Sequence, residues 1–407
     1  MTIDLRELVD KLPYPKPPSK KKWSIFAFVL IILIVLFLLV FLNDTAIKYS
    51  TLTWVFIIVF PILIVGLVYG IRLFIYEQRC SYVQAWNEQH DKTEAELIYV
   101  AQQYITLIDH IYMVENICNN INDISTTLGM ADKLFTFKLP KGEYIPIKYT
   151  RIDCFSGELE DRIRQAFAFI FSNFKDALKD IIPSNDVNLI ISVNTEVNDY
   201  QTIIEKLLEP YKNTIFTNYY FTNKNEGLFF LDEWLDSRES KYQLYCEITL
   251  REKPLVDSGE FISLFLLNFT DKPSEHNHIA IHRPVKKFKD SDSIEYALKT
   301  ALEWGDCQEQ DLEYIWFAGL PYDEKVAILL LIDALEFSIT VNNTVDLNLI
   351  FGNTGNSSGA LALSAAIEQT KKSQLPQLVI YKTDSLQMLI VKSVSNNPNN
   401  NQEATNE

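Results

Sequence analysis

The most informative stretch for the fold of this chain is Val345–Gln369, VDLNLIFGNTGNSSGALALSAAIEQ. It begins with an apolar run, Val345–Phe351, that is typical of a buried strand. A loop rich in glycine and asparagine follows, and then a segment of small residues, Ser358–Thr370, that is typical of a helix packed closely in the centre of a domain. A strand, a loop and a helix in this order indicate a parallel sheet that is covered by helices on both faces.

The same order of elements occurs twice along the chain. In the second half we expect strands at His278–Val285, Leu312–Phe317, Val345–Phe351, Gln377–Tyr381 and Gln387–Val394, and helices at Ser293–Trp304, Asp323–Leu335 and Ser358–Thr370. In the first half we expect strands at Tyr144–Ile152, Val187–Val193, Thr214–Phe221, Tyr242–Leu250 and Gly259–Leu267, and helices at Leu159–Ile181, Gln201–Leu208 and Glu226–Leu235. The predicted fold class is therefore α/β, with two stacked βαβαβαββ halves.

Two apolar stretches precede these halves. Trp23–Leu42 contains no charged residue, and Leu52–Ile71 contains a proline, Pro61. A helix of either length spans the hydrocarbon core of a membrane, which is about 30 Å thick. No small-residue cleavage site follows the first stretch, so a cleaved signal peptide is not expected. The sequence predicts a transmembrane hairpin of two helices.

Basic residues set the expected orientation of this hairpin. Six lysines and arginines precede the first stretch, whereas the linking loop carries only Lys48. Because basic residues favour the cytoplasmic side, we expect a multi-pass protein of the inner membrane with both termini in the cytoplasm.

The rest of the chain is acidic. The formal net charge is −16, and residues 1–76 hold eight basic and four acidic residues, so the remainder carries about −20. Such a charge repels phosphate backbones and argues against nucleic-acid binding. The acidity either keeps the domain soluble or binds a basic protein partner. The cysteines are scattered, odd in number and without a C-x-x-C pair, which suits a reducing cytoplasm and favours neither disulfides nor zinc.

A helical connector is expected between the membrane and the α/β part. From Thr93 to about Ile121 apolar residues recur at spacings of three and four, as in an amphipathic helix. This helix either packs on its own domain or forms the surface of a homodimer. The expected segments are a basic N-terminus (1–22), two spans (23–76), the connector (77–140), the two halves (141–271 and 272–394) and a disordered polar tail (395–407).

The second half resembles the β-ketoacyl synthases. Ala297–Lys325, ALKTALEWGDCQEQDLEYIWFAGLPYDEK, is similar to a helix, turn, strand and glycine loop of that family, and Val345–Gln369 is similar to the strand, loop and helix that follow. The resemblance covers roughly Tyr144–Val394, in the first half by topology alone, and implies a thiolase-like fold. The segment Tyr76–Trp86, rich in Tyr and Trp, and the general layout more weakly resemble type VI secretion lipase adaptors.

The residues that the family uses in catalysis are missing. Its members carry a Cys nucleophile after the third strand of the first half, and two His after the second and third strands of the second half. The corresponding positions here, Phe221–Asn225, Phe317–Pro321 and Gly352–Asn356, contain neither residue, and Cys154 and Cys246 fall elsewhere. The resemblance therefore implies a non-condensing relative without catalytic residues or cofactor.

The loop before the small-residue helix is a weak candidate ligand site. Backbone N–H groups around Asn353, Thr354, Ser357 and Ser358 could hold a phosphate at the start of a helix. The loop lacks the lysine of a P-loop and follows a late strand, which favours a structural turn.

Two further groups of polar residues need interpretation. His276, His278 and His282 share one face of a strand but extend over about 20 Å, so no metal site is expected. Asp232, Glu233 and Asp236 form the acidic edge of a helix, which is either a solvated face or a contact for a basic partner.

Together these features predict a membrane-anchored, non-catalytic scaffold or adaptor on the cytoplasmic side of a bacterial inner membrane. The weaker resemblance implies that it loads an effector into a type VI secretion system. The alternative is a membrane-associated enzyme of acyl or lipid metabolism with an unrecognised active site. A Cys or His that faces a pocket between the halves would separate the two.

Overall fold

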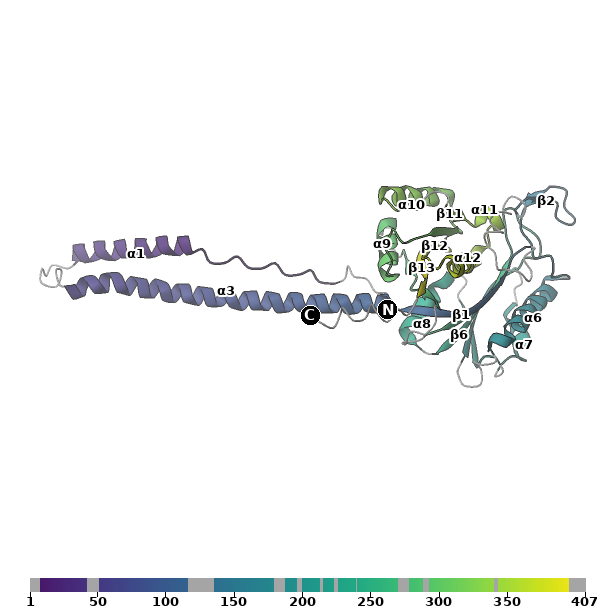
Figure 1. Ribbon diagram of the computed structural model, residues 1–407, viewed down its shortest axis with the longest axis horizontal. Coiled ribbons are helices and arrows are strands. Elements are labelled where there is room, and N and C mark those ends of the chain that lie inside the picture. The colour runs from purple at the N-terminus through teal and green to yellow at the C-terminus, as the bar shows by residue number, and fades with distance from the viewer. Residues whose placement is uncertain are drawn as a thin grey trace. The chain divides into compact units, whose positions relative to one another are not determined.

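The computed structural model describes residues 8–41, 51–115, 135–178, 187–195, 200–212, 215–222, 226–238, 240–269, 278–287, 293–339 and 343–394. The chain divides into two compact units, residues 3–97 and residues 98–407 with the first two residues (Figure 1). The loop between the apolar stretches, His276 and the expected polar tail lie outside the described residues.

The N-terminal unit contains two long helices, α1 (Lys20–Phe41) and α3 (Thr51–Ala101). Helix α3 has 51 residues and continues through Pro61, so it includes the expected second span and residues 77–101 of the expected connector. Within the described part of the chain, one helix, Ile58–Ala101, is long and apolar enough to cross a membrane. The rings of Trp23 and Tyr69 are 5.7 Å apart, which brings the two helices into contact. The hairpin of two spans stays a prediction.

The other unit is a mixed α/β domain, and 11 strands of its described residues form one large sheet. The first half contributes β1 (Tyr104–Met113), β4 (Val187–Asn194), β5 (Asn218–Phe221), β6 (Tyr242–Thr249) and β7 (Phe261–Asn268). The second half contributes β8 (His278–His282), β10 (Tyr314–Ala318), β11 (Thr344–Asp346), β12 (Gln377–Lys382) and β13 (Leu386–Val394), with β9 (Val285–Lys286) beside β13. A separate small sheet pairs β2 (Phe137–Lys138) with β3 (Ile147–Lys148).

The strand order confirms the duplication. Numbered along the chain, the five main strands of each half follow the order third, second, fourth, fifth, first across the sheet. In both halves the third, second and fourth strands are parallel, and the fifth is antiparallel to the fourth and to the first. The two first strands, β1 and β8, pair with each other and join the halves into one continuous sheet.

The prediction that the connector helix continues beyond Ala101 was wrong. Residues 104–113 form strand β1, the first strand of the repeat, and Tyr144–Ile152 supplies only the two-residue β3. The pairing of β1 with β7 shifts by one residue between Leu107 and Asp109. Such a bulge breaks the alternation of a strand and produces apolar spacings of three and four, which imitate a helix. The compact unit accordingly begins at Ile98 rather than near residue 141.

A second correction concerns Val345–Phe351, where a strand was predicted. Only Thr344–Asp346 is extended, and α11 (Asn348–Phe351) follows at once. The carboxylate of Asp346 accepts a hydrogen bond from the Asn348 N–H at 3.1 Å. This contact satisfies a donor at the start of the helical turn and ends the strand.

Different helices cover the two faces of the sheet. Helices α6 (Leu159–Leu178) and α7 (Tyr200–Leu208) pack on one face of the first half and form a core with residues of that half alone (Figure 1). Helix α9 (Ile294–Trp304) packs on β13 of the second half, and α10 (Tyr322–Ala334) follows β10. The apolar sequence of Asp323–Leu335 favours a buried helix, but Leu330 is 65% exposed and only Ile328 and Ile332 of α10 are buried.

Helices α8 (Phe230–Ser237) and α12 (Ser358–Ser373) share one core with strands of both halves. The burial of α12 is confirmed, since Ala360, Ala362, Ala365 and Ala366 all belong to this core. Hereafter the inner face means the side of the sheet that these two helices cover.

The two halves meet at the ring of Tyr381. Its hydroxyl accepts a hydrogen bond from the N–H of Leu228, in the single turn η3 (Gly227–Phe229) that precedes α8, at 2.8 Å. A Cβ on Gly227 or on Gly359 would lie 2.8 or 2.7 Å from that ring. The turn η3 and helix α12 therefore both approach β12 at positions where only glycine leaves room for the Tyr381 side chain.

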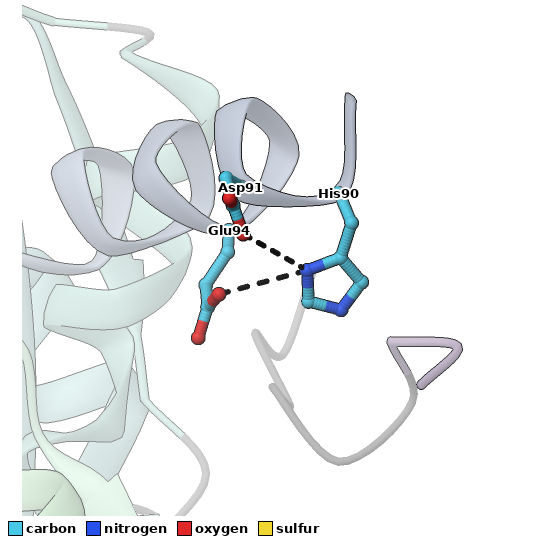
Figure 2. A group of neighbouring side chains, drawn as sticks. All are labelled: His90, Asp91 and Glu94. Carbon is cyan, nitrogen blue, oxygen red and sulfur yellow. Dashed lines mark ion pairs between the residues drawn. The ribbon is translucent and has the colours of Figure 1, made fainter. Parts of the chain in front are cut away.

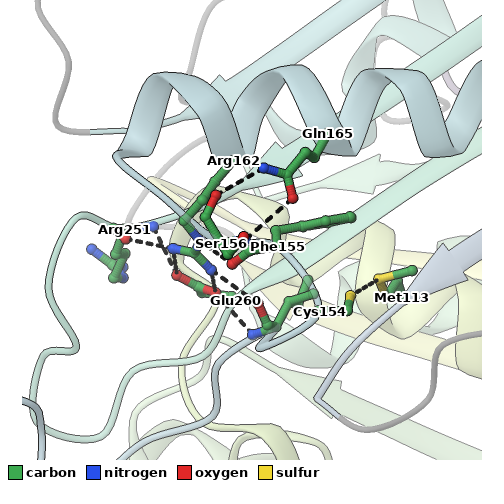
Figure 3. A network of polar contacts seen from close by, with 9 residues as sticks. Met113, Cys154, Phe155, Ser156, Arg162, Gln165, Arg251 and Glu260 are labelled. Atoms are coloured by element: carbon green, nitrogen blue, oxygen red, sulfur yellow. Dashed lines mark hydrogen bonds and ion pairs between the residues drawn. The ribbon is translucent and has the colours of Figure 1, made fainter.

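A buried ion pair fixes the loop that precedes α6. Arg162 and Glu260 are 1% and 3% exposed, and Arg162 Nη1 lies 2.9 Å from Glu260 Oε1 (Figure 3). The same carboxylate accepts hydrogen bonds from the backbone N–H groups of Ile152 at 2.9 Å and Arg251 at 3.0 Å. Because both partners have further hydrogen bonds, this pair is a structural clamp rather than a reactive site.

Candidate functional site

Strands β4 and β6 present different side chains to the two faces of the sheet. Leu189, Ile191 and Leu244 belong to the apolar core under α6 and α7. On the inner face the pairing places Asn188 beside Gln243 and Ser192 beside Glu247. All four are at most 8% exposed. The first half thus buries a polar surface that the apolar appearance of its strands did not predict.

A cavity of about 400 Å³ lies on this inner face, bounded by β4, β5, α8 and the start of β6. Its aromatic walls are Tyr220, Phe221, Phe230 and Trp234. Its polar lining consists of Asn188, Thr222, Glu226, Glu233, Ser237, Ser240 and Gln243, and Ile190 completes it. This volume is at the lower end of the range for small-molecule pockets, which is roughly 300–1,000 Å³.

Two buried polar atoms of the lining have no hydrogen-bond partner within the described part of the chain. They are Ser240 Oγ and Gln243 Oε1, in residues that are 6% and 5% exposed. Trp234 is held in place, because its indole Nε1–H donates to the Ser240 carbonyl at 3.0 Å. Buried polar atoms are normally paired. These two oxygens have almost no exposed surface, so they lie beneath the cavity lining and do not face the cavity.

The cavity reaches the position where the resemblance to the β-ketoacyl synthases would place a nucleophile. Phe221 and Thr222, at the carboxyl end of β5, line it. Asn223–Asn225 lie outside the described residues, and by sequence they contain neither Cys nor His. None of the described residues of the lining is Cys, His or Lys. The lining consists of aromatic rings, hydroxyls, amides and carboxylates, with one isoleucine.

Further along the inner face, Glu247 forms a fully buried hydroxyl network. Its Oε1 accepts hydrogen bonds from Ser192 at 2.9 Å and Ser357 at 2.7 Å, and its Oε2 accepts one from Tyr245. Burial raises the pKa of Glu247 to about 7, although the three hydrogen bonds oppose the shift. The sequence analysis missed this residue, because a lone Glu in an apolar strand gives no local signal of its partners.

The glycine-rich loop before α12 supplies part of this network. Thr354, Ser357 and Ser358 are fully buried, and the Ser358 hydroxyl donates to the Gly355 carbonyl at 2.7 Å. Asn353 is exposed and exchanges backbone hydrogen bonds with the 257–259 segment. The hydroxyl side chains of these three residues thus lie inside the protein. The weak phosphate site, which was predicted from the backbone N–H groups of this loop, stays a prediction.

The acidic edge of α8 is only partly exposed. Asp232 is 4% exposed and pairs with the buried Arg283 at 2.5 Å, and Asp236 pairs with the same arginine at 2.8 Å. Burial raises the pKa of Asp232 against the opposing effect of Arg283. Asp232 is therefore a structural ion-pair partner and no surface contact, and Glu233 is the member of the three that lies at the cavity.

The two described histidines of β8, His278 and His282, both pack beside Tyr104. The rings of His278 and His282 lie 5.8 and 5.5 Å from the ring of Tyr104. His282 Nδ1 lies 3.0 Å from the Trp304 carbonyl, and burial lowers the pKa of His282 to about 3. His276, the third member of the predicted set, lies outside the described residues.

One histidine lies near the inner face. His110 Nε2 is 3.2 Å from Glu368 Oε1, and His110 Nδ1 is 3.2 Å from Lys371 Nζ, both on α12. Burial, and then the charge of Lys371, lower the pKa of His110 well below its ordinary value. Cys246 is buried within β6 and Cys154 is exposed, with its thiol 3.6 Å from Met113 Sδ (Figure 3). None of these residues lines the cavity.

The N-terminal unit holds a cluster that could bind a metal ion. His90 Nδ1 lies 3.7 Å from Asp91 and 3.6 Å from Glu94, on successive turns of α3 (Figure 2). Lys11 already approaches Asp91 at 2.6 Å, and this hydrogen bond lowers the pKa of the carboxyl. The lysine ammonium thus takes the place at which a cation would sit.

Comparisons with known proteins give a limited result. No family model matches the sequence, and no curated protein matches it. Among solved structures, a single-residue variant of OleA from Xanthomonas campestris is similar, with a TM-score of 0.45, 12% identity, and coverage of 71% of this chain and 98% of that one. The cerulenin-bound structure of OleA gives a TM-score of 0.44 at 12% identity, covering 71% and 99%. A similarity this low carries no conclusion about activity.

Proposed function

We propose that this protein is a membrane-anchored, non-catalytic adaptor with a thiolase-like domain on the cytoplasmic side of a bacterial inner membrane. The observation that carries the proposal is the cavity on the inner face. Aromatic rings, amides and carboxylates line it, and no Cys, His or Lys does among the described residues. A binding surface built in this way fits recognition of a partner, and Glu233 contributes the acidic character that a basic partner would require.

The N-terminal unit supports the membrane anchor. Leu63 and Leu67 on α3 are 64% and 67% exposed, and Phe28 on α1 is 65% exposed. Apolar side chains exposed along such lengths are stable in a lipid environment and not in water. In its narrowest form the proposal has a type VI secretion effector as the partner.

The adaptor is tested by affinity purification of the full chain from detergent-solubilised membranes, followed by identification of the co-purifying proteins. We expect a protein partner whose recovery decreases at high salt, because charged rims mainly accelerate encounter. A chain that is recovered alone at low salt, in repeated preparations, would contradict the adaptor.

The predicted topology has its own test. Reporter fusions after Glu407 and within the 43–51 loop should show a cytoplasmic C-terminus and an external loop, because basic residues concentrate before the first span. A reporter after Glu407 that is active only in the periplasm would contradict this orientation.

The alternative is an acyl- or lipid-metabolising enzyme, and Glu247 is the observation in its favour. A carboxyl with a pKa of about 7 is suited to proton transfer at neutral pH. Its complete burial argues for a structural role instead. Incubation of the purified full chain with an acyl thioester should give neither product nor a covalent adduct. An acyl adduct on Cys154, the exposed thiol, would favour the enzyme.

A further inference from the structure

The cluster on α3 brings three possible metal ligands close together. His90 Nδ1 lies 3.7 Å from Asp91 Oδ1 and 3.6 Å from Glu94 Oε2, and the three ligand atoms all lie within 4.8 Å of one another (Figure 2). In a tetrahedral zinc site with bonds of about 2.0–2.2 Å, neighbouring ligand atoms are roughly 3.3–3.6 Å apart. The spacing of the cluster is therefore close to that of a ligand set.

The histidine nitrogen of this cluster has no hydrogen-bond partner among the described residues. The His90 side chain is 12% exposed, and Nδ1 itself is buried. Both carboxylate oxygens lie beyond hydrogen-bond distance from it. In the neutral tautomer with the proton on Nε2, Nδ1 directs a lone pair toward Asp91 and Glu94 (Figure 2). Three atoms at this spacing leave room between them for a metal ion and not for a water molecule, which explains why Nδ1 is screened from solvent.

A lysine now supplies the positive charge at this position. Lys11 Nζ lies 2.6 Å from Asp91 and 4.0 Å from Glu94, and these three side chains are 42–58% exposed. The segment that carries Lys11 is held separately, because the Leu12 N–H donates to Asn87 Oδ1 at 2.9 Å and the Leu12 carbonyl accepts from Asn87 Nδ2 at 3.1 Å. Exposed ion pairs are weak, so the ammonium can leave the carboxylates while Leu12 stays bound.

The charges and the ligand types favour a transition-metal dication over the lysine. One ammonium balances one of the two carboxylates, whereas a dication balances both. A set of one imidazole and two carboxylates suits Zn²⁺, while Ca²⁺ and Mg²⁺ prefer oxygen ligands alone. From Ile71, the end of the expected second span, to His90 the helix rises roughly 28 Å, so the cluster lies where aqueous ions can reach it.

We propose that His90, Asp91 and Glu94 bind a zinc-like dication, and that Lys11 occupies this position when the metal is absent. Binding of the metal displaces the Lys11 ammonium from the carboxylates and leaves a further coordination position for water. This site is independent of the adaptor function and of the cavity in the α/β domain.

Calorimetric titration of the untagged full chain in detergent micelles with ZnCl₂ tests the site. The thiols are first blocked with iodoacetamide, because thiolates also bind zinc. We expect saturable binding of Zn²⁺, and binding of Ca²⁺ and Mg²⁺ that is weaker by roughly tenfold or more. No saturable heat with Zn²⁺, or equal binding of Ca²⁺, would overturn the proposal.

Variants of the ligands connect the binding to the cluster. His90→Leu keeps a side chain of similar size and removes the nitrogen ligand, and Glu94→Gln removes a carboxylate. Even the groups that orient metal ligands contribute roughly 10–100-fold to affinity, so each variant should weaken Zn²⁺ binding by roughly tenfold or more. Glu96→Gln is the matched control, because it removes an exposed carboxylate of the same helix outside the cluster. With the helix shown intact by circular dichroism, unchanged Zn²⁺ binding in His90→Leu refutes the site.

Lys11 tests the exchange itself. Lys11→Met removes the competing ammonium and should strengthen Zn²⁺ binding several-fold. In the natural chain the hydrogen bond to Asp91 raises the pKa of Lys11, so its displacement by Zn²⁺ should speed acetylation of Nζ by acetic anhydride. Peptide mass spectrometry measures this rate, with the exposed Lys141 as the unchanged reference. If Lys11→Met leaves the zinc affinity unchanged, or Zn²⁺ leaves the acetylation of Lys11 unchanged, the lysine does not occupy the metal position and the exchange is refuted.

Discussion

Strands β10, β12 and β13 of the second half present Trp316, Val379 and Leu389 to the inner core, where α12 packs on them. The matching strands of the first half, β4 and β6, present Asn188, Gln243 and Glu247 on the same face. The covering helices differ too, since α12 has 16 residues and α8 has eight. A long helix of small residues closes the second half, while a short helix leaves the cavity in the first.

This difference shows that two halves with the same topology can have inner faces of different polarity and packing. In the second half, close packing of Ala362 and its neighbours makes the inner face a core. In the first half, α8 is positioned by the pairing of Asp232 with Arg283, a residue of the other half. Leu231 and Leu235 of that helix also pack into the core that it shares with α12, and the cavity remains beside Phe230 and Trp234.

The largest expected effect comes from breaking the ion pair under α8. Asp232→Asn would leave Arg283, which is 1% exposed, without its main charge partner. Removing one member of a buried pair costs about 3–5 kcal/mol of unfolding free energy. Urea unfolding of the full chain in detergent measures the loss.

The neighbouring exposed acid provides the control. Glu233→Gln should change the unfolding free energy by no more than about 0.5 kcal/mol. If Asp232→Asn is as harmless as Glu233→Gln, the ion pair does not hold α8, and apolar packing alone positions this helix as it does α12.

The next effect depends on pH. The pKa of Glu247 is about 7 in the folded protein, above the ordinary 4.5, so folding favours the protonated carboxyl. Its contribution to stability is fully present below pH 4.5 and is lost as the pH rises to 7, by about 3 kcal/mol over this range. A glutamine side chain does not titrate, so the Glu247→Gln variant should gain stability over the natural chain between pH 5 and pH 8.

The measurement is the unfolding free energy of both chains at those two pH values. Glu252→Gln, which removes an exposed carboxylate, should show no such difference. Parallel pH dependence of Glu247→Gln and the natural chain would mean that the buried network does not titrate in this window.

The smallest effect compares added volume in the two halves directly. Ala362→Leu enlarges a fully buried residue of the packed core and should cost about 1–3 kcal/mol. Ser237→Leu adds similar bulk to the cavity lining and should change stability by about 0.5 kcal/mol or less. Thermal unfolding of both variants measures the two losses of stability. Equal losses would indicate that the first half is packed as tightly as the second.

The β1 strand marks where local patterns were insufficient. The spacing of its apolar residues favoured a helix. The same spacing fits a strand with a bulge after Leu107, and this bulge arises where β1 pairs with β7. Periodicity acts over a few residues, whereas this pairing joins segments that are far apart along the chain. The shortening of the next expected strand, Tyr144–Ile152, follows from the same cause, since β1 occupies its place in the sheet.

The sequence by itself determined the order of most strands and helices, the repeat, the apolar N-terminal stretches, the small-residue central helix and the missing Cys and His. These features depend on composition and on periodicity within single elements. Only the tertiary structure decided that Asp232 meets Arg283, that Glu247 meets Ser357 and that a cavity remains above Gln243. The burial of a polar group depends on partners from distant segments, and 110 residues separate Glu247 from the serine that binds it.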